Sequence, residues 1–331
     1  MSVYKVAVFS TKPYDQQFLD QVQLGSNIEF TYFETRLRQS TMRLADEFDA
    51  VSCFVNDIVD HAVLEHLAKV GVKMIALRCA GFNNVDVAAA NELGIRVANV
   101  PSYSPESVAE HALTLMLALN RKIIRAHSRV HEHNFELNGL LGFNFAKATV
   151  GIIGAGKIGI ATLRALKGLG CELLCYDPVH NAEAAELATY VPIDELYRRS
   201  HVISLHCPLN EHTYHLINAD SIAQMRDNVM LINTSRGGLV NTQAALDGMK
   251  SGKIGYLGLD VYELEGDLFF RDLSDEVLND DVFGLLLSYP NVIITGHQGY
   301  FTQEALAQIA GTTLYNLQQF FCGELSGNEL K

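Results

Sequence analysis

The chain has 331 residues, of which 48% are hydrophobic and 19% are charged, and its formal net charge at pH 7 is −13. The length predicts two domains, and the composition is that of a packed globular protein rather than a disordered one. The negative charge argues against nucleic acid or an anionic membrane as a partner, and no uncharged apolar run of about 18 residues predicts a transmembrane helix.

Six cysteines are scattered along the chain, and no second cysteine pair or histidine cluster accompanies Cys171 and Cys175. We therefore expect no metal site and buried, reduced thiols. The first ten residues, MSVYKVAVFS, run directly into a strand pattern and lack the long apolar segment of a secretion signal. Together these features predict a cytoplasmic protein.

The first third of the chain alternates between strand and helix patterns. Strands are expected at 3–9, 28–33, 50–55 and 74–77, with a helix near 62–70, and this alternation predicts a parallel sheet. The strand at 74–77 runs into the turn RCAGFNNVD. Backbone N–H groups at the carboxyl end of a strand could cradle a carboxylate, although a plain strand-to-helix loop is the alternative.

The middle of the chain contains a break and a long helix. The proline-rich segment 99–105 is a candidate boundary, and the apolar run 107–119 predicts a buried helix that links two α/β units. Residues 127–148 are polar and include three histidines, His127, His131 and His133. A solvated surface is favoured there over a metal site, because no carboxylate or cysteine spacing accompanies them.

The most informative stretch is TVGIIGAGKIGIATLRALKGLGCELLCYD, residues 149–177. A short apolar strand leads into glycines at 154, 156 and 159, a helical pattern and a second strand that ends at Asp177. In this order the glycines allow a tight turn, close approach of a pyrophosphate and close packing of the helix on the strand. A carboxylate about 20 residues further on can bind an adenosine ribose and repel a 2′-phosphate. The stretch predicts NAD binding.

The rest of the chain continues the alternation, with strands expected at 202–206, 230–233, 254–260 and 292–295 and a last helix at 304–320 that packs on the first unit. Each strand ends at a polar loop, where an open α/β sheet places its ligands. Reduction of a ketone needs a proton donor, a cation that holds and polarises the substrate, and a group that adjusts the pKa of the proton donor. His297, Arg236 and Glu265 suit these parts, although each could instead be structural; Asp260 could lie near the nicotinamide or its ribose.

At these residues the chain resembles the D-isomer-specific 2-hydroxyacid dehydrogenases, and most closely the fermentative bacterial D-lactate dehydrogenases. The resemblance spans nearly the whole chain. It is carried by ALRCAGFNNVD at 76–86, VPSYSPESVAEHA at 100–112, GIIGAGKIG at 151–159, VISLHCPL at 202–209, LINTSRGGLV at 231–240, GLDVYELEGDLFF at 258–270 and TGHQGYFTQEAL at 295–306.

The resemblance implies roles for individual residues. The catalytic Arg, Glu and His are Arg236, Glu265 and His297. The substrate is held by the amides of Ala80 and Gly81, by Tyr103, and by Arg236 and His297. The cofactor NAD is contacted by Gly154, Gly156, Lys157, Ile158, Gly159, Asp177, Cys207, Pro208, Thr213, Asn233, Thr234, Ser235 and Asp260. No metal is implied.

The resemblance also implies an architecture of two Rossmann-like parallel-sheet domains, one flavodoxin-like and one dinucleotide-binding, with the catalytic cleft between them. The substrate domain is discontinuous, residues 1–101 and 299–331, and the cofactor domain is 102–298. A homodimer through the cofactor domains is expected, and a tetramer is an alternative. The chain departs from the pattern at Gly299-Tyr300, where Ala-Phe is expected, and at Thr213, where Asn is expected.

The sequence thus predicts an NAD-dependent dehydrogenase that reduces pyruvate to D-lactate. Phe54, Tyr103 and Tyr300 would form a small aromatic-walled pocket if all three point inward, which favours pyruvate over a larger 2-keto acid. A dehydrogenase for such a larger acid, such as 2-hydroxyisocaproate, is the first alternative. A non-catalytic, NAD-sensing protein like the corepressors built on this fold is the second, although no extended tail or basic segment supports it.

Overall fold

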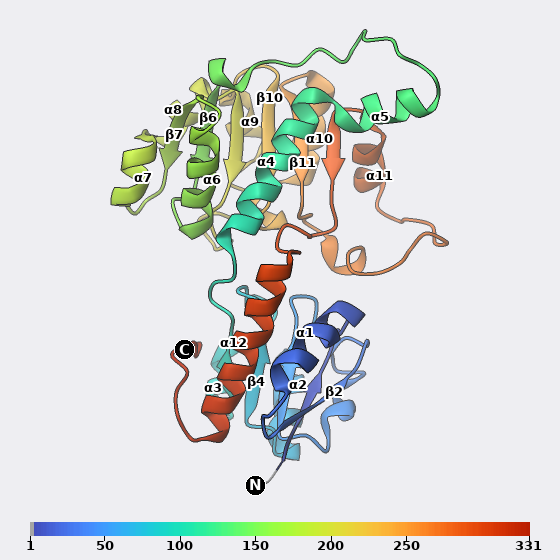
Figure 1. Ribbon diagram of the computed structural model, residues 1–331, viewed down its shortest axis with the longest axis vertical. Coiled ribbons are helices and arrows are strands. Elements are labelled where there is room, and N and C mark those ends of the chain that lie inside the picture. The colour runs from blue at the N-terminus through green and yellow to red at the C-terminus, as the bar shows by residue number, and fades with distance from the viewer. Residues whose placement is uncertain (1–2) are drawn as a thin grey trace. The chain divides into compact units, whose positions relative to one another are not determined.

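The computed structural model describes residues 3–331. The chain forms two compact α/β units (Figure 1). Unit 1 contains the residues up to Ser104 together with Tyr300–Lys331, and unit 2 is Pro105–Gly299. None of the helices within residues 3–331 has both the length and the apolar character needed to cross a bilayer.

Unit 1 is built on a five-stranded parallel sheet with the order β2-β1-β3-β4-β5. Its strands are β1 Tyr4–Val8, β2 Ile28–Tyr32, β3 Ala50–Cys53, β4 Met74–Leu77 and β5 Arg96–Ala98. Its helices are α1 Pro13–Gln23, α2 His61–Val70, α3 Val87–Glu92 and α12 Gln303–Phe321, with a 3₁₀ turn, η1, at Met42–Ala45. The buried strands β3 and β4 lack the polar alternation of a half-exposed strand, as expected of a sheet covered on both faces.

The C-terminal helix belongs to unit 1, as the sequence predicts. Leu314 and Leu317 of α12 join Leu19 of α1 and the side chains of β1 in one core, and Tyr4 stacks on Phe321 with ring centroids 3.9 Å apart. The chain beyond α12 then forms an antiparallel bridge with the end of β5. The last residues of the chain therefore complete the first unit rather than the second.

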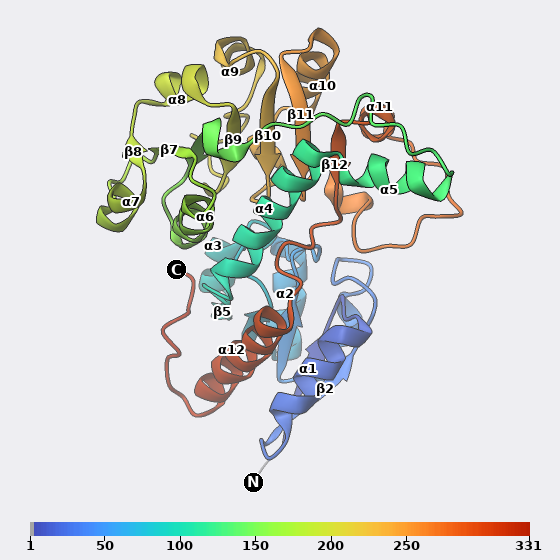
Figure 2. The ribbon, with the colours of Figure 1, turned by 45° about the horizontal axis from the view of Figure 1, so that its top comes forward.

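Unit 2 is built on a seven-stranded parallel sheet with the order β12-β11-β10-β9-β6-β7-β8 (Figures 1 and 2). Its strands are β6 Thr149–Ile153, β7 Glu172–Tyr176, β8 Thr189–Tyr190, β9 Val202–Leu205, β10 Val229–Asn233, β11 Ile254–Leu259 and β12 Val292–Ile294. The chain builds outward from β6 to β8, crosses back and builds outward again from β9. The sheet therefore changes direction between β6 and β9, the position at which doubly wound folds bind their ligands.

Helices cover both faces of this sheet. They are α4 Pro105–Arg121, α5 Ile123–His131, α6 Lys157–Lys167, α7 Ala182–Leu187, α8 Ile193–Arg199, α9 Ala219–Gln224, α10 Thr242–Ser251 and α11 Asp281–Ser288, with 3₁₀ turns η2 Phe145–Lys147, η3 Gly237–Leu239 and η4 Glu265–Asp267. One core lies between the sheet and α4, α6 and α7. A second lies between the sheet and α8 to α11. The predicted fold class, two parallel-sheet α/β units, is confirmed.

The segment between α4 and β6 differs from the polar surface that the sequence predicts. The helix α5 buries none of its residues. Large apolar side chains stand exposed on it and on the chain that follows: Ile123, Ile124, Val130, Phe135, Leu137 and Leu141. His127 and His131 pair with each other through their Nε2 atoms, 3.0 Å apart. We call residues 123–143 the α5 arm.

Candidate active site

The glycine motif lies at the turn between β6 and α6, at the carboxyl end of the sheet. Gly154 has a φ of +104°, and a Cβ atom there would lie 2.6 Å from the backbone of His206 and Cys207. A Cβ atom on Gly159 would lie 2.0 Å from the carbonyl oxygen of Gly154. Only glycine fits either position, because the first needs a left-handed backbone and both need contact with neighbouring main chain.

Gly156 has a different part in the same turn. It is exposed, and a Cβ atom built on it meets nothing within 4 Å. It is also the N-cap of α6 and, as a glycine, has no side chain with which to cap that end of the helix. The turn is thus open where Gly156 and Lys157 begin the helix, and a helix N-terminus attracts anions.

Asp177 follows β7 and lies beside this turn. Its Oδ2 accepts a hydrogen bond from the amide of Ala155 at 2.7 Å, and its Oδ1 accepts one from the amide of Val179 at 2.8 Å. The carboxylate is only partly buried. The strand, turn, helix and acid therefore have the spatial arrangement that the sequence spacing predicts for a dinucleotide site.

The loops after β9 and β10 face the same end of the sheet and are tied to each other. The hydroxyl of Ser235 donates to the carbonyl of Cys207 at 2.6 Å, and burial raises the pKa of the Cys207 thiol to about 11. The hydroxyl of Thr213 donates to the carbonyl of Pro208, also at 2.6 Å. Thr234 Oγ1 is buried and lacks a hydrogen-bond partner among residues 3–331. A buried hydroxyl of this kind, together with the open turn at Gly156, fits a bound polar group such as a dinucleotide.

Asn233 was predicted to contact the cofactor, and its side chain is fully buried inside the protein. Its amide nitrogen donates to the carbonyl of Arg236 at 2.8 Å, and its side-chain oxygen accepts from the amide of Ser235 at 3.0 Å. The side chain thereby fixes the turn that presents Arg236. A contact of Asn233 with the cofactor stays a prediction.

Arg236 begins a tight turn packed against the loop after β11. The residue is partly exposed, and its Nη1 donates to the carbonyl of Ser235 at 2.7 Å. A Cβ atom on the next residue, Gly237, would lie 2.1 Å from the carbonyl oxygen of Tyr262. The glycine therefore lets the backbone of the Arg236 turn lie directly against Tyr262.

Glu265 and His297 form a hydrogen-bonded pair. The Nδ1 of His297 lies 2.9 Å from Oε1 of Glu265, and Oε2 of Glu265 accepts from the amide of Tyr262 at 2.9 Å. The side chain of Glu265 is 24% exposed and that of His297 is 14% exposed. Since a carboxylate is only an acceptor, Nδ1 carries a proton in this pair. The structure therefore brings together two of the three predicted catalytic side chains, and the third, Arg236, lies on the adjoining loop.

Asp260 anchors the segment that carries His297. Its carboxylate accepts hydrogen bonds from the Thr295 hydroxyl at 2.5 Å and from the amides of Gln298 and Gly299 at 2.9 and 2.8 Å. Nε2 of His111, on α4, lies 3.2 Å from Oδ1 of Asp260 and 3.0 Å from the Thr295 hydroxyl. Burial alone would raise the pKa of Asp260, but these hydrogen bonds and the charge of His111 outweigh it and lower the pKa. The predicted cofactor contact of Asp260 stays a prediction; its observed contacts position the catalytic segment.

The predicted substrate residues Ala80, Gly81 and Tyr103 lie in unit 1. Ala80 and Gly81 follow the carboxyl end of β4, where the Asn99 side chain donates to the carbonyl of Ala80 at 2.7 Å. Tyr103 packs edge-to-face on Tyr300, with ring centroids 6.1 Å apart. The Tyr300 ring also lies beside the ring of Phe54, with centroids 6.0 Å apart. The three aromatic residues that were predicted to line a pocket therefore form one cluster.

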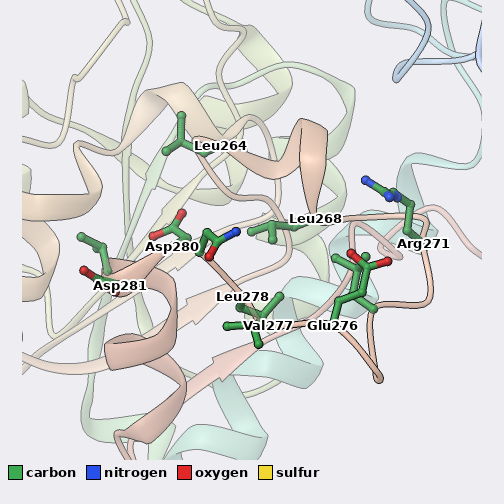
Figure 3. A pocket seen from close by; sticks show the side chains of 11 residues that line it. Leu264, Leu268, Arg271, Glu276, Val277, Leu278, Asp280 and Asp281 are labelled. Carbon is green, nitrogen blue, oxygen red and sulfur yellow. The ribbon is translucent and has the colours of Figure 1, made fainter.

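A cavity of about 500 Å³ lies elsewhere in unit 2, among residues 264–282 (Figure 3). Asp280 and Asp281 line one side of it, and Glu276 with Arg271 lines the other. Three carboxylates against one guanidinium make this cavity a poor site for an anionic substrate or a pyrophosphate. None of the predicted catalytic or cofactor residues lines it.

Comparison with known proteins agrees with this doubly wound, dinucleotide-binding architecture. Residues 113–299 match the family model of the D-isomer specific 2-hydroxyacid dehydrogenase, NAD binding domain. A 2-hydroxyacid dehydrogenase homolog of Haemophilus influenzae is 53% identical over 325 residues, 98% of each chain. The D-lactate dehydrogenase of Escherichia coli is 52% identical over 327 residues, 98% of this chain and 99% of that one. The solved structure of the pyruvate reductase of Chlamydomonas reinhardtii superposes with a TM-score of 0.92 at 44% identity and 99% coverage of both chains.

The chain belongs to the D-isomer-specific 2-hydroxyacid dehydrogenases. It is thus an oxidoreductase, and unit 2 contains the NAD-binding domain of the family. We expect this cofactor to bind at the glycine turn, at the open start of α6 and beside the buried Thr234 hydroxyl.

Proposed function

We propose that this protein is an NAD-dependent D-lactate dehydrogenase that reduces pyruvate to D-lactate. The observation that carries the proposal is the 2.9 Å hydrogen bond between Glu265 and His297, on loops adjoining Arg236 at the carboxyl end of the unit 2 sheet. Two relatives, one named a D-lactate dehydrogenase and one a pyruvate reductase, support this choice of substrate.

In the proposed mechanism, NADH supplies the hydride when it is bound. The turn at Gly154, Gly156 and Gly159 and the start of α6 hold its pyrophosphate, and Asp177 accepts hydrogen bonds from its adenosine ribose. The carboxylate of Asp177 would repel the 2′-phosphate of NADPH, which makes NAD the preferred cofactor. The further cofactor contacts are proposed for Lys157, Ile158, Cys207, Pro208, Thr213, Asn233, Thr234, Ser235 and Asp260.

Arg236 and His297 carry the chemistry at the substrate. The guanidinium of Arg236 binds the carboxylate of pyruvate and polarises its carbonyl group. His297, doubly protonated, donates the proton on Nε2 to the oxygen that develops negative charge as the carbonyl carbon is reduced. Glu265 holds the ring through Nδ1 and stabilises the positive charge of the imidazolium. Hydride and proton together convert the ketone to an alcohol, and the imidazole is left neutral.

Unit 1 supplies the remaining substrate contacts in this proposal. The backbone amides of Ala80 and Gly81 grip the carboxylate, and Tyr103 lies against the substrate. Residues 1–101 and 299–331 then form the substrate domain, and residues 102–298 form the cofactor domain. The Tyr103–Tyr300–Phe54 cluster supports a small substrate, because its bulky rings restrict the space available to the side chain of the 2-keto acid.

A dehydrogenase for a larger D-2-hydroxy acid, such as 2-hydroxyisocaproate, is the alternative. We expect kcat/KM with NADH to be highest for pyruvate, lower for 2-ketobutyrate and lowest for 2-ketoisocaproate, and to fall when NADPH replaces NADH. Absorbance at 340 nm measures all of these rates. A higher kcat/KM for 2-ketoisocaproate than for pyruvate would assign the enzyme to the larger substrate.

We further propose that the protein is a cytoplasmic homodimer or homotetramer. The exposed apolar side chains of the α5 arm support self-association, since monomeric proteins seldom leave a group of such residues in water. All six cysteines are free thiols, which supports a reducing compartment. Light scattering of the wild type and of the variant Phe135→Asp/Leu137→Asp tests the interface. The variant should dissociate, and an unchanged mass would place the interface elsewhere.

The catalytic assignment is tested by the variant His297→Gln. We expect kcat for pyruvate to fall at least about a thousandfold, because the proton donor is lost while the hydride path remains. The dissociation constant of NADH, measured by its fluorescence, should stay within about twofold of the wild type. Unchanged turnover in this variant would remove His297 from the mechanism.

A further inference from the structure

Another carboxylate–imidazole pair in unit 2 involves Glu263, two residues before Glu265. The Nε2 of His215 lies 2.5 Å from Oε1 of Glu263, and the two side chains are 24% and 23% exposed. The side-chain nitrogen of Asn241, Nδ2, lies 3.3 Å from Nδ1 of His215. The side-chain oxygen of Asn241 accepts a hydrogen bond from the backbone amide of Ala244. Asn241 thus presents a donor to His215, so that Nδ1 is the acceptor and Nε2 the donor.

The backbone of His215 connects this pair to the turn that follows Arg236. Its φ is +50°, in the left-handed region that residues other than glycine seldom adopt. In this conformation its amide donates to the carbonyl of Gly238 at 2.9 Å, within the turn that follows Arg236. Local strain of this kind is retained where the surrounding contacts require it.

The other oxygen of Glu263 reaches the far end of the same turn. Oε2 accepts from the backbone amide of Thr242 at 3.1 Å and from its hydroxyl at 2.9 Å, where α10 begins. Burial alone would raise the pKa of Glu263, but the hydrogen bonds from His215 and Thr242 outweigh it and lower the pKa. One carboxylate therefore connects the loop that carries Glu265 with both sides of the turn that follows Arg236.

We infer that Glu263 and His215 are positioning residues, which fix the Arg236 turn against the loop that carries Glu265. The kinetic consequences of this inference rest on the proposed function. Arg236 binds the substrate in the ground state and binds the transition state more strongly, so displacement of its turn should raise KM for pyruvate and lower kcat together. Neither Glu263 nor His215 is placed at the cofactor, and KM for NADH should change little.

The test compares Glu263→Gln, His215→Asn and His215→Gln with the wild-type enzyme. Gln at 263 places an NH₂ group against one of the two residues that donate to Glu263, His215 or Thr242. Asn at 215 tolerates the left-handed backbone but does not reach Glu263, whereas Gln at 215 supplies a donor at similar reach. A matched control is Asp46→Asn in unit 1, which breaks the surface pair of Asp46 with His66, whose atoms lie 2.7 Å apart.

We expect Glu263→Gln and His215→Asn to raise KM for pyruvate about tenfold and to lower kcat, with His215→Gln and the Asp46→Asn control much closer to wild type. A merely structural role would lower the active fraction, and hence kcat, at an unchanged KM. That result, or unchanged kinetics, would overturn the inference.

Hydrogen exchange of residues 236–242 supplies a readout that needs no turnover. In Glu263→Gln these amides should exchange faster than in the wild type, and in Asp46→Asn they should not. Equal exchange in Glu263→Gln and the wild type would overturn the inference even if pyruvate is not the substrate. If the wild type fails to reduce pyruvate but the exchange accelerates as expected, the proposed function is wrong and the positioning pair stands.

Discussion

Acid should destabilise this protein through His206, which packs beneath the glycine turn. Its Nε2 lies 2.9 Å from the Ser204 hydroxyl, and its Nδ1 is enclosed without a hydrogen-bond partner in the described part of the chain. Burial lowers the pKa of His206 from 6.5 to about 4. Because the folded pKa is below the unfolded one, the unfolded chain takes up the proton first as the pH falls. Stability is therefore lost between about pH 6.5 and pH 4, and the share lost between pH 7 and pH 5 is about 2 kcal/mol.

The assay is urea unfolding of the wild type and of His206→Gln at pH 7 and pH 5. Far-UV circular dichroism is the probe, because the chain has no tryptophan, and dilute protein is needed near the pI of about 5.3. The free energy of unfolding of the variant minus that of the wild type should be about 2 kcal/mol greater at pH 5 than at pH 7. His212→Gln is the control, since the His212 side chain is 86% exposed and should show no such difference. A difference between wild type and His206→Gln that does not change with pH would refute the reasoning.

Three further predictions concern the cofactor and substrate sites. Gly159→Ala should weaken NADH binding and lower Tm by several degrees, because its Cβ would lie 2.0 Å from the Gly154 carbonyl; Gly168→Ala, with 3.4 Å to its nearest neighbour, should do neither. Asp177→Ala should reduce the preference for NADH over NADPH by about tenfold or more in kcat/KM, and an unchanged ratio would contradict the ribose contact. Arg236→Gln should raise KM for pyruvate and lower kcat in steady-state assays, and a rise in KM at an unchanged kcat would mean that the guanidinium stabilises the ground state and the transition state equally.

Most of the fold is predictable because its strands are apolar, mostly buried and bounded by turn residues. The strand expected at 74–77 is β4 residue for residue, and the glycine turn has the local context that its spacing indicates. The strands β5 and β8, of three and two residues, have no sequence pattern that predicts them. Strands this short at the edge of a sheet are too brief to show a hydrophobic period, and they form because the adjacent strands β4 and β7 pair with them.

The site is less predictable from residues alone, because its contacts join distant parts of the chain. Glu265 and His297 are 32 residues apart, and the resemblance to a family, not their spacing, selects them from other polar strand-end residues. The pair of His215 and Glu263 spans 48 residues and gives no sequence signal beyond an acidic loop. His111 lies within the otherwise apolar pattern of 107–119, and this is the one sequence feature that indicates a special role for it. In the structure it forms an ion pair with the buried Asp260.

The most direct test of the central claim is the configuration of the product that the wild-type enzyme makes from pyruvate and NADH. After exhaustive conversion, chiral chromatography of the lactate should give the D-enantiomer alone, in a one-to-one ratio to the NADH consumed. The L-enantiomer, or a racemic product, would contradict the proposal that this site reduces pyruvate to D-lactate. Tight NADH binding with no lactate formed would contradict the proposal that this chain is a lactate dehydrogenase.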